Sequence, residues 1–206
     1  MDVLVANSHN VRDRVRRYLG REAEVVYPPV DVGRHAWRGQ EGFYLSAARL
    51  DPLKRVDVVV AAFAQMPEAR LVVASDGPDG PRIRRLASGH ANIELLGPVD
   101  EGTLARLLGT CIATVYVPRD EDFGMSPVES MAAGKPVIGV DEGGLRETVL
   151  PGETGLLLPP EFTVEELRQA VRFLDATTAQ DMRAACEERA EAFDAQLFTT
   201  RMRALL

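Results

Sequence analysis

Two glutamates eight residues apart, Glu121 and Glu129, frame a Phe-Gly pair at the start of an apolar helical run in the segment EDFGMSPVE. The free amides of a helix N-terminus form a ready site for an anion, and a diphosphate is the anion we expect there. Carboxylates beside that anion would repel it unless they contact hydroxyl groups instead. The segment therefore predicts a ligand that carries phosphates and hydroxyls together, with one glutamate on a sugar and the other on a ribose.

A purely structural interpretation of the same segment competes with this one. The residues Ser-Pro-Val-Glu at 126–129 match a helix start, with Ser126 as the N-cap, Pro127 at the first helical position and Glu129 reaching back to the cap amide. This interpretation explains Glu129 without any ligand. It leaves the acids at 121–122 and the Phe-Gly pair unexplained, and such a pair in a loop suggests a backbone that another group approaches closely.

Two cations follow an earlier apolar run, FYLSAARL. Arg49 and Lys54 lie five residues apart, and each could hold a phosphate, arginine through its planar fork and lysine as a mobile point charge. Two solvated cations flanking Asp51-Pro52 are the simpler alternative. A third loop, DGPDGP, contains Gly77, which suits a strand-to-helix turn because glycine tolerates positive φ, and Pro78, which suits a first helical position.

Short apolar runs alternate with helical patterns from Gly42 onward, and these elements must position the three loops. The runs are FYLSAARL, ARLVVAS, NIELLG, IATVYVP, PVIGV and TGLLLPP. Apolar strands separated by helices predict an α/β fold, a Rossmann-like doubly wound parallel sheet with helices on both faces. Ligands of such sheets bind outside the carboxyl ends of the strands, and all three loops leave from those ends.

The two ends of the chain differ from this regular middle. Residues 1–39 read as a strand, a helix, a strand and a polar link, which we separate from a nucleotide-sugar-binding domain at 40–206. In the helix NVRDRVRRYLG, Val11, Val15 and Leu19 are expected to form a buried face with the arginines outside it. Those arginines lie on a solvated face, or else steer the chain towards an anionic lipid surface. Three helices end the chain, the first opened by a capping box from Thr163 to Glu166.

Composition excludes several classes of protein. A net charge of −7 argues against nucleic-acid binding, which needs a basic surface. Two distant cysteines suit a reducing compartment, and three scattered histidines provide no metal-ligand spacing, so we expect no metal site. No apolar run reaches the length of a membrane span and no signal-peptide layout is present, which favours a cytoplasmic location, with peripheral membrane contact as an option. The absence of G-x-G-x-x-G after the first strands disfavours a dehydrogenase.

The spacing Glu-x7-Glu with Phe-Gly inside it resembles the donor site of the retaining glycosyltransferases of family 4, which have the GT-B fold. The resemblance is to the C-terminal, donor-binding half of that fold and extends along nearly the whole chain. Six segments agree in order and spacing: ANSHNVRDRVRRYLGREAEVVYPPVD, SAARLDPLKRVD, VASDGPDGP, LLGPVDEGTLARLL, EDFGMSPVESMAAGKPVIGVDEGGLRETV and GETGLLL. The EDFG and YPPVD segments favour the branch that resembles mannosyltransferases using GDP-mannose.

The resemblance implies a role for each matching residue. Arg49 and Lys54 would neutralise the donor diphosphate and, with Glu121, form the catalytic centre. Glu129 would hold the ribose hydroxyls, and the loop GPVDEG would lie beside the base. The donor-binding residues implied in this way are Gly77, Val99, Glu101, Asp122, Phe123, Gly124, Met125, Ser126 and Glu129. The implied reaction is transfer of a hexose from a nucleotide-diphosphate sugar (GDP-mannose or a UDP-sugar) with retention and without a metal or other cofactor.

A GT-B enzyme also has an N-terminal domain that supplies the acceptor site, and residues 1–31 resemble only the last strand-helix-strand of that domain. We therefore expect the acceptor domain to come from outside this chain or from a partner chain. Apolar surface that faces it would favour a homo-oligomer or a partner. A catalytic half and a non-catalytic nucleotide-sugar-binding subunit both stay open. A phosphorylase or sugar-nucleotide epimerase is a third option, which the glutamate spacing disfavours.

Overall fold

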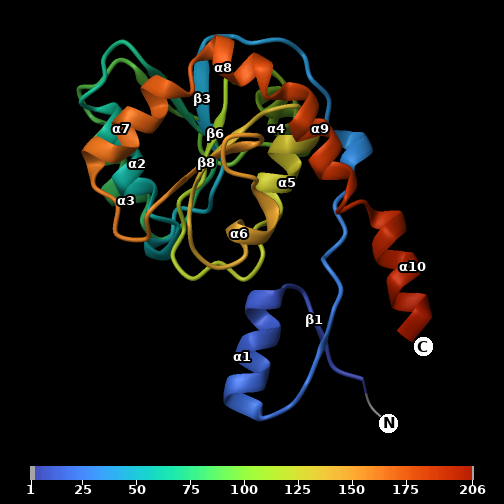
Figure 1. The fold of residues 1–206 in the computed structure, drawn as a ribbon. Coiled ribbons are helices and arrows are strands. Elements are labelled where there is room, and N and C mark those ends of the chain that lie inside the picture. Colours follow the sequence, from blue (N-terminus) through green and yellow to red (C-terminus); the bar gives the residue numbers. More distant parts are fainter. Residues whose placement is uncertain (1–2, 206) are drawn as a thin grey trace.

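Six parallel strands form the main sheet of the computed structural model, which describes residues 3–205 (Figure 1). In spatial order they are β5 (Ile93–Leu95), β4 (Arg70–Val73), β3 (Phe43–Ser46), β6 (Thr114–Val115), β7 (Val137–Val140) and β8 (Gly155–Leu158). The strands fall within the six apolar runs of the sequence, although each is shorter than its run. The predicted doubly wound parallel sheet is confirmed.

The strand order places the topological switch point between β3 and β6. The chain moves outward from β3 through β4 to β5, returns to β6, and moves outward again through β7 to β8. β3 and β6 pair through Leu45 and Thr114, so the loops that follow these two strands leave the sheet side by side. Ligands of open α/β sheets bind at such a switch point. The loops that carry Arg49, Lys54 and Glu121 therefore meet where a ligand is expected.

Helices cover both faces of this sheet. In Figure 1, α2, α3 and α7 lie on one side, and α4, α5 and α9 lie on the other. Alternate side chains of a strand point to opposite faces, and Tyr44 of β3 accordingly packs in a different hydrophobic cluster from Phe43 and Leu45. The helix bounds are α2 (Val56–Phe63), α3 (Gly80–Ala87), α4 (Glu101–Thr110), α5 (Met125–Ala132), α6 (Leu145–Thr148), α7 (Val164–Phe173) and α9 (Arg183–Glu191).

A separate two-stranded sheet begins the chain. β1 (Val5–Ala6) and β2 (Glu24–Val25) are parallel and are joined by α1 (His9–Leu19), so the predicted strand-helix-strand is present. α1 contains no buried residue, and Leu19 is 65% exposed. The predicted buried face on Val11, Val15 and Leu19 is therefore wrong, because within residues 3–205 α1 has only this narrow sheet and a few loop contacts to pack on.

The link and the C-terminal helices complete the described chain. A 3₁₀ helix, η1 (Val32–Arg34), starts the link to β3, and a second one, η2 (Pro52–Lys54), precedes α2. The predicted capping box from Thr163 to Glu166 is present at α7. The next predicted helix is divided into α8 (Ala176–Asp181) and α9, and α10 (Ala195–Leu205) extends away from the main sheet (Figure 1). None of the helices within residues 3–205 combines the length and apolar character that crossing a membrane requires.

Lys135 fixes the link to the main sheet. Its side chain is fully buried, its Nζ donates to the Gly39 carbonyl at 2.6 Å, and the same Nζ lies 3.2 Å from the centroid of the Trp37 ring. Burial lowers the pKa of Lys135 to about 8, with the nearby Arg183 acting in the same direction. The link is thus held by a buried cation rather than by regular secondary structure.

This buried lysine predicts a pH dependence of stability. Between pH 8 and its ordinary value of 10.5, Lys135 binds fewer protons in the native state than in the unfolded state, so its contribution to stability rises with pH in that window. We expect Lys135→Met to remove that contribution, so that the wild type gains stability relative to the variant as pH rises from 8 to 10. Urea unfolding of both proteins at several pH values measures the difference, and a constant difference would contradict the prediction.

Candidate functional site

Three side chains from the loops after β3 and β6 form one hydrogen-bonded group at the switch point. Lys54 Nζ lies 2.5 Å from Glu121 Oε2 and donates to the Tyr116 hydroxyl at 3.1 Å. The Tyr116 hydroxyl in turn donates to Glu121 Oε2 at 2.5 Å. The side chains of Lys54 and Glu121 are 29% and 15% exposed, so this ion pair is partly shielded from water. Burial, with the Glu121 carboxylate as a second cause, raises the pKa of Tyr116.

The backbone around this group is anchored by Arg55. Arg55 adopts the left-handed conformation, with φ of 51°, between η2 and α2. Its Nε donates to the Val117 carbonyl at 2.6 Å, and its guanidinium lies 4.6 Å from the Phe162 ring centroid. Burial lowers its pKa from the ordinary arginine value, which is high enough that the guanidinium stays charged near neutral pH. Lys54 and the end of β6 are thereby fixed to each other.

The N-terminus of α5 differs from the predicted helix start. α5 begins at Met125, Gly124 is its N-cap at φ of 90°, and no side chain caps it. Ser126 is therefore the second residue of the helix rather than its N-cap, and Glu129 is the fifth. The interpretation of Glu129 as part of a cap is wrong, because the left-handed glycine starts the helix two residues earlier than the Ser-Pro pattern indicates. The first amides of α5 are left without a side-chain acceptor, as an anion site requires.

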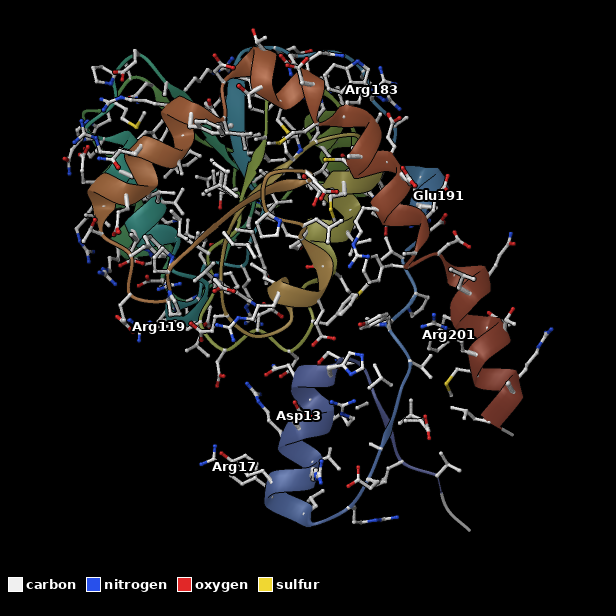
Figure 2. All side chains as sticks on the ribbon, in the orientation of Figure 1. Asp13, Arg17, Arg119, Arg183, Glu191 and Arg201 are labelled. Carbon is white, nitrogen blue, oxygen red and sulfur yellow. The ribbon has the colours of Figure 1, made fainter. Side chains whose placement is uncertain are left out.

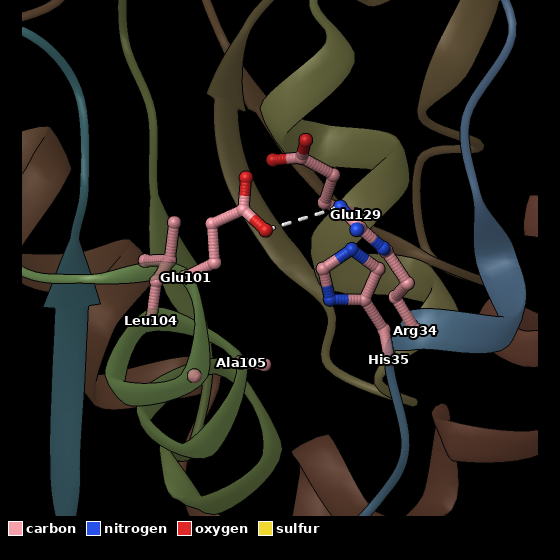
Figure 3. Close-up of a pocket in the computed structure, with 7 residues that line it drawn as sticks. Arg34, His35, Glu101, Leu104, Ala105 and Glu129 are labelled. Carbon is pink, nitrogen blue, oxygen red and sulfur yellow. Dashed lines mark ion pairs between the residues drawn. The ribbon is translucent and has the colours of Figure 1, made fainter.

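Glu129 lines two adjoining cavities. The larger, of about 410 Å³, lies between η1, α4 and α5 and is lined by Arg34, His35, Glu101, Gly102, Leu104, Ala105 and Glu129 (Figure 3). The smaller, of about 50 Å³, is lined by Ala47, Ala48, Leu104, Leu108, Thr114, Val115, Tyr116, Ser126 and Glu129. Burial raises the pKa of Glu129, and no neighbouring charge or hydrogen bond offsets that effect. Tyr116 joins the smaller cavity to the Lys54–Glu121 pair, so the site is continuous.

The link supplies one wall of the larger cavity. An Arg34 guanidinium nitrogen, NH1, lies 3.3 Å from Glu101 Oε2, and Figure 3 shows this ion pair with His35 beside Arg34. The His35 Nδ1 is buried without a hydrogen-bond partner among residues 3–205, and burial lowers the pKa of His35. The imidazole is therefore neutral near pH 7. Glu101, predicted beside the base, does line this cavity, with its carboxylate directed to Arg34.

The acidic loop, residues 120–124, turns its side chains in different directions. Glu121 points to Lys54, whereas Asp122 lies 2.9 Å from an Arg14 guanidinium nitrogen and faces α1. The Phe123 ring is 2% exposed and stacks on Tyr27, with the ring centroids 5.4 Å apart. The Phe-Gly pair therefore has a structural cause as well: the ring belongs to the core and the glycine starts α5. The structure does not bring the Asp122 and Phe123 side chains to the cavity.

The other predicted donor residues lie around the site rather than in the cavities. Gly77 does not have positive φ, and α3 begins at Gly80 rather than at Pro78, so both reasons offered for that turn are wrong. A Cβ at Gly77 would overlap the Leu50 carbonyl, which makes close approach its constraint. Val99 packs beside the smaller hydrophobic cluster, and Met125 is 45% exposed.

Sequence reasoning missed three residues of the site: Tyr116, Arg34 and His35. Tyr116 lies within the apolar run IATVYVP, directly after β6, and an aromatic hydroxyl at the carboxyl end of a switch-point strand is a usable signal. Arg34 and His35 stand in a segment assigned to a polar link, with no pattern to mark them. Arg49 is exposed and forms no ion pair within the described chain, so its guanidinium is available to a ligand. No cluster of three or more potential metal ligands occurs among residues 3–205.

The fold is that of an α/β domain of the GT-B type. Residues 30–193 match the family described as glycosyl transferases group 1, so the chain belongs to that family. It is 30% identical over 158 residues to an uncharacterised glycosyltransferase of Methanocaldococcus jannaschii, a match that covers 76% of this chain and 45% of the relative. It is 29% identical to the D-inositol 3-phosphate glycosyltransferase of Streptomyces bingchenggensis, covering 83% of this chain and 45% of that protein. The chain thus spans less than half the length of these curated relatives.

Solved structures agree with this assignment. Sucrose-phosphate synthase from Thermosynechococcus elongatus superposes with a TM-score of 0.87 at 27% identity, over 99% of this chain and 57% of that one. Anabaena HepE, solved with UDP and glucose, has a TM-score of 0.81 at 21% identity, over 98% of this chain and 62% of that one. At that identity the second likeness concerns the fold alone.

Proposed function

We propose that this chain is the donor-binding half of a retaining, metal-independent hexosyltransferase that takes a nucleotide-diphosphate sugar, with a UDP-sugar as the first candidate. The observation that carries the proposal is Glu129, a partly buried carboxylate one turn inside α5. It has no side-chain partner among residues 3–205 and lines two cavities beside an uncapped helix N-terminus. A desolvated carboxylate without a partner is costly unless a ligand pairs with it. Ribose hydroxyls are such a ligand.

Each part of the donor then has a matching group. The diphosphate lies at the uncapped α5 amides, with Arg49 and Lys54 supplying positive charge, as electrostatic stabilisation of a leaving group requires. Glu121 meets the transferred hexose. The base occupies the larger cavity between α4 and η1. Lys54 is bound to Glu121 in the structure, so donor binding must bring the diphosphate within reach of a lysine that is already held in place.

UDP as the donor nucleotide is supported by similar solved structures that contain UDP. Anabaena HepE was solved with UDP and glucose, and the pneumococcal GtfA with UDP and GlcNAc. GDP-mannose is the alternative donor, supported by the EDFG and YPPVD segments of the sequence. A non-catalytic subunit that binds the donor for a partner chain is the second candidate function. It is supported by the likeness, at a TM-score of 0.82, to a chain of the GtfA/B complex.

Calorimetric titration of the purified chain with UDP, GDP and ADP, then with UDP-glucose and GDP-mannose, tests the proposal. We expect UDP to bind at least about tenfold more tightly than the other two nucleotides, a difference of about 1.4 kcal/mol. Selective binding of GDP would move the donor to GDP-mannose, and no binding by any nucleotide would contradict the proposal for this chain. A donor-hydrolysis and transfer assay then separates the catalytic half from the non-catalytic subunit.

A further inference from the structure

α1 and Tyr27, which lies two residues after β2, together contact every residue of the acidic loop from Asp120 to Phe123. Arg14 of α1 bridges two carboxylates, with nitrogen-to-oxygen distances of 2.5 Å to Asp120 and 2.9 Å to Asp122. Asn10 donates from Nδ2 to the Glu121 carbonyl at 3.2 Å. The fourth contact is the stacking of Tyr27 on Phe123 described above. The loop that presents Glu121 is therefore held by α1, more than a hundred residues away in the sequence, and by Tyr27.

α1 is itself fixed at its N-terminus, one turn before Arg14. The Glu147 carboxylate of α6 accepts hydrogen bonds from the backbone amides of His9 and Asn10, both at 2.8 Å. It also accepts one from the Tyr27 hydroxyl at 3.1 Å. A carboxylate at a helix N-terminus is favoured by the free amides and by the helix dipole. Arg14, one turn along the helix from Asn10, is thus placed by the main body of the protein.

The backbone of the loop needs such support. Asp120 has φ of 57°, a left-handed conformation that costs energy in a residue other than glycine. Its amide donates to a Glu142 carboxylate oxygen at 2.7 Å. From this turn, Asp120 and Asp122 point outward to Arg14, and Glu121 between them points inward to Lys54. The outward ion pairs and the inward one hold alternate residues of the same strained loop.

We propose that Arg14 is a positioning residue: by bridging Asp120 and Asp122 it holds the acidic loop in the conformation that presents the Glu121 carboxylate to the donor sugar. It acts through the loop and does not itself contact the donor. The effect of Arg14 on sugar binding rests on the proposed function, whereas the effect of Arg14 on the conformation of the acidic loop does not. The side chain of Asp120 is 74% exposed and that of Asp122 55%, and such exposed pairs contribute little to global stability. A local effect is therefore expected.

Amide hydrogen exchange measured by mass spectrometry on the full chain tests the hold on the loop. We expect Arg14→Ala to speed exchange over residues 119–124 about tenfold, because local opening governs exchange there. Arg17→Ala is the matched control: Arg17 is on the same helix, is exposed, borders the same surface pocket as Arg14 and Asp120, and forms no ion pair within residues 3–205 (Figure 2). In the Asp120→Asn/Asp122→Asn background, Arg14→Ala should add nothing further. Wild-type protein in about 1 M NaCl should approach the variant, since salt screens exposed pairs.

Calorimetry on the same proteins tests the consequence for the sugar. Arg14→Ala should leave UDP affinity unchanged and raise the ratio of the UDP-glucose Kd to the UDP Kd roughly threefold or more, whereas a merely structural role would change both ligands together. Equal exchange in Arg14→Ala and Arg17→Ala would overturn the proposal, and so would faster exchange with an unchanged ratio. If the wild type binds no nucleotide, the proposed function fails, and the exchange data alone still decide whether Arg14 holds the loop.

Discussion

Glu129→Gln is expected to weaken nucleoside diphosphate binding about tenfold to a hundredfold, since a hydrogen bond to a charged group contributes about 1.5–3 kcal/mol. The substitution keeps the shape of the side chain and removes the charge that the ribose hydroxyls would meet. Glutamine can still accept one hydrogen bond through its amide oxygen, so a residual affinity should remain. Calorimetric titration of wild type and variant with UDP measures the change.

The same substitution should leave the fold intact or stabilise it. Burial raises the pKa of Glu129 above its ordinary value of 4.5, so the native state binds the proton more tightly than the unfolded state does. For an acid with a raised pKa, stability falls as pH rises past the unfolded value. Removing the carboxyl therefore gains stability at pH 7 relative to the wild type. That gain should shrink as pH falls from the raised native pKa towards 4.5 and should be lost below 4.5, which thermal unfolding at several pH values can follow.

A glutamate that lines neither cavity provides the control. Glu191, at the exposed end of α9, can be changed to Gln without touching either cavity, and this variant should bind UDP as the wild type does. If Glu129→Gln instead destabilises the protein and leaves UDP affinity unchanged, Glu129 acts in the helix and not on a ligand. The lack of a partner for the Glu129 carboxylate among residues 3–205 would then have no functional meaning.

The sheet could be predicted from the sequence because buried parallel strands need uninterrupted apolar runs, and such runs are visible without tertiary information. FYLSAARL and IATVYVP mark β3 and β6, and with them the switch point and the loops that follow. Lys54 and Glu121 are 67 residues apart in the sequence. Their loops meet because β3 and β6 are neighbours in the sheet, an arrangement that the alternation of strands and helices predicts.

The start of α5 could not be predicted by the same route. The pattern Ser-Pro-x-Glu satisfies every local rule for a cap, yet the helix begins earlier because Gly124 takes φ of 90° against the Leu145 side chain, 3.1 Å from where its Cβ would be. Packing between α5 and α6 therefore overrides the local signal. The difference matters for function, because Glu129 does not bind the amide of Ser126 as a capping residue would.

Residues contributed by the ends of the chain were also beyond prediction. Apolar residues at four-residue spacing, Val11, Val15 and Leu19, predict a buried face, but α1 has too little of the described chain beside it to bury one. Its contribution is instead polar, through Asn10 and Arg14 on the acidic loop. Which arginine of VRDRVRRYLG reaches a loop a hundred residues later depends on the docking of α1 on Glu147, and no spacing in the sequence encodes that.

Gly144→Ala is expected to destabilise the protein by about 1–3 kcal/mol, as overpacking typically does, and to abolish binding of the sugar nucleotide. Gly144 follows β7, is buried, and donates its amide to the Glu121 carbonyl at 2.9 Å. A Cβ there would overlap the Phe123 Cα and lie 2.6 Å from the Asp122 carbonyl oxygen. These are backbone atoms, which cannot rotate away, so the acidic loop must move as a unit.

The conformation of Gly144 makes this a steric test alone. Its φ of −68° is one that alanine adopts freely, so no backbone strain contributes. Gly33→Ala is the control, because a Cβ at Gly33 meets only the Asp31 carboxylate, at 3.7 Å. Thermal unfolding should show a Tm lowered by about 2–4 °C for each kcal/mol in a chain of this size, and calorimetry should show UDP-glucose binding lost in Gly144→Ala only. If the melting temperature falls while UDP-glucose affinity stays the same, the acidic loop does not contact the donor. Any contact between the loop and the donor would change when the loop is displaced.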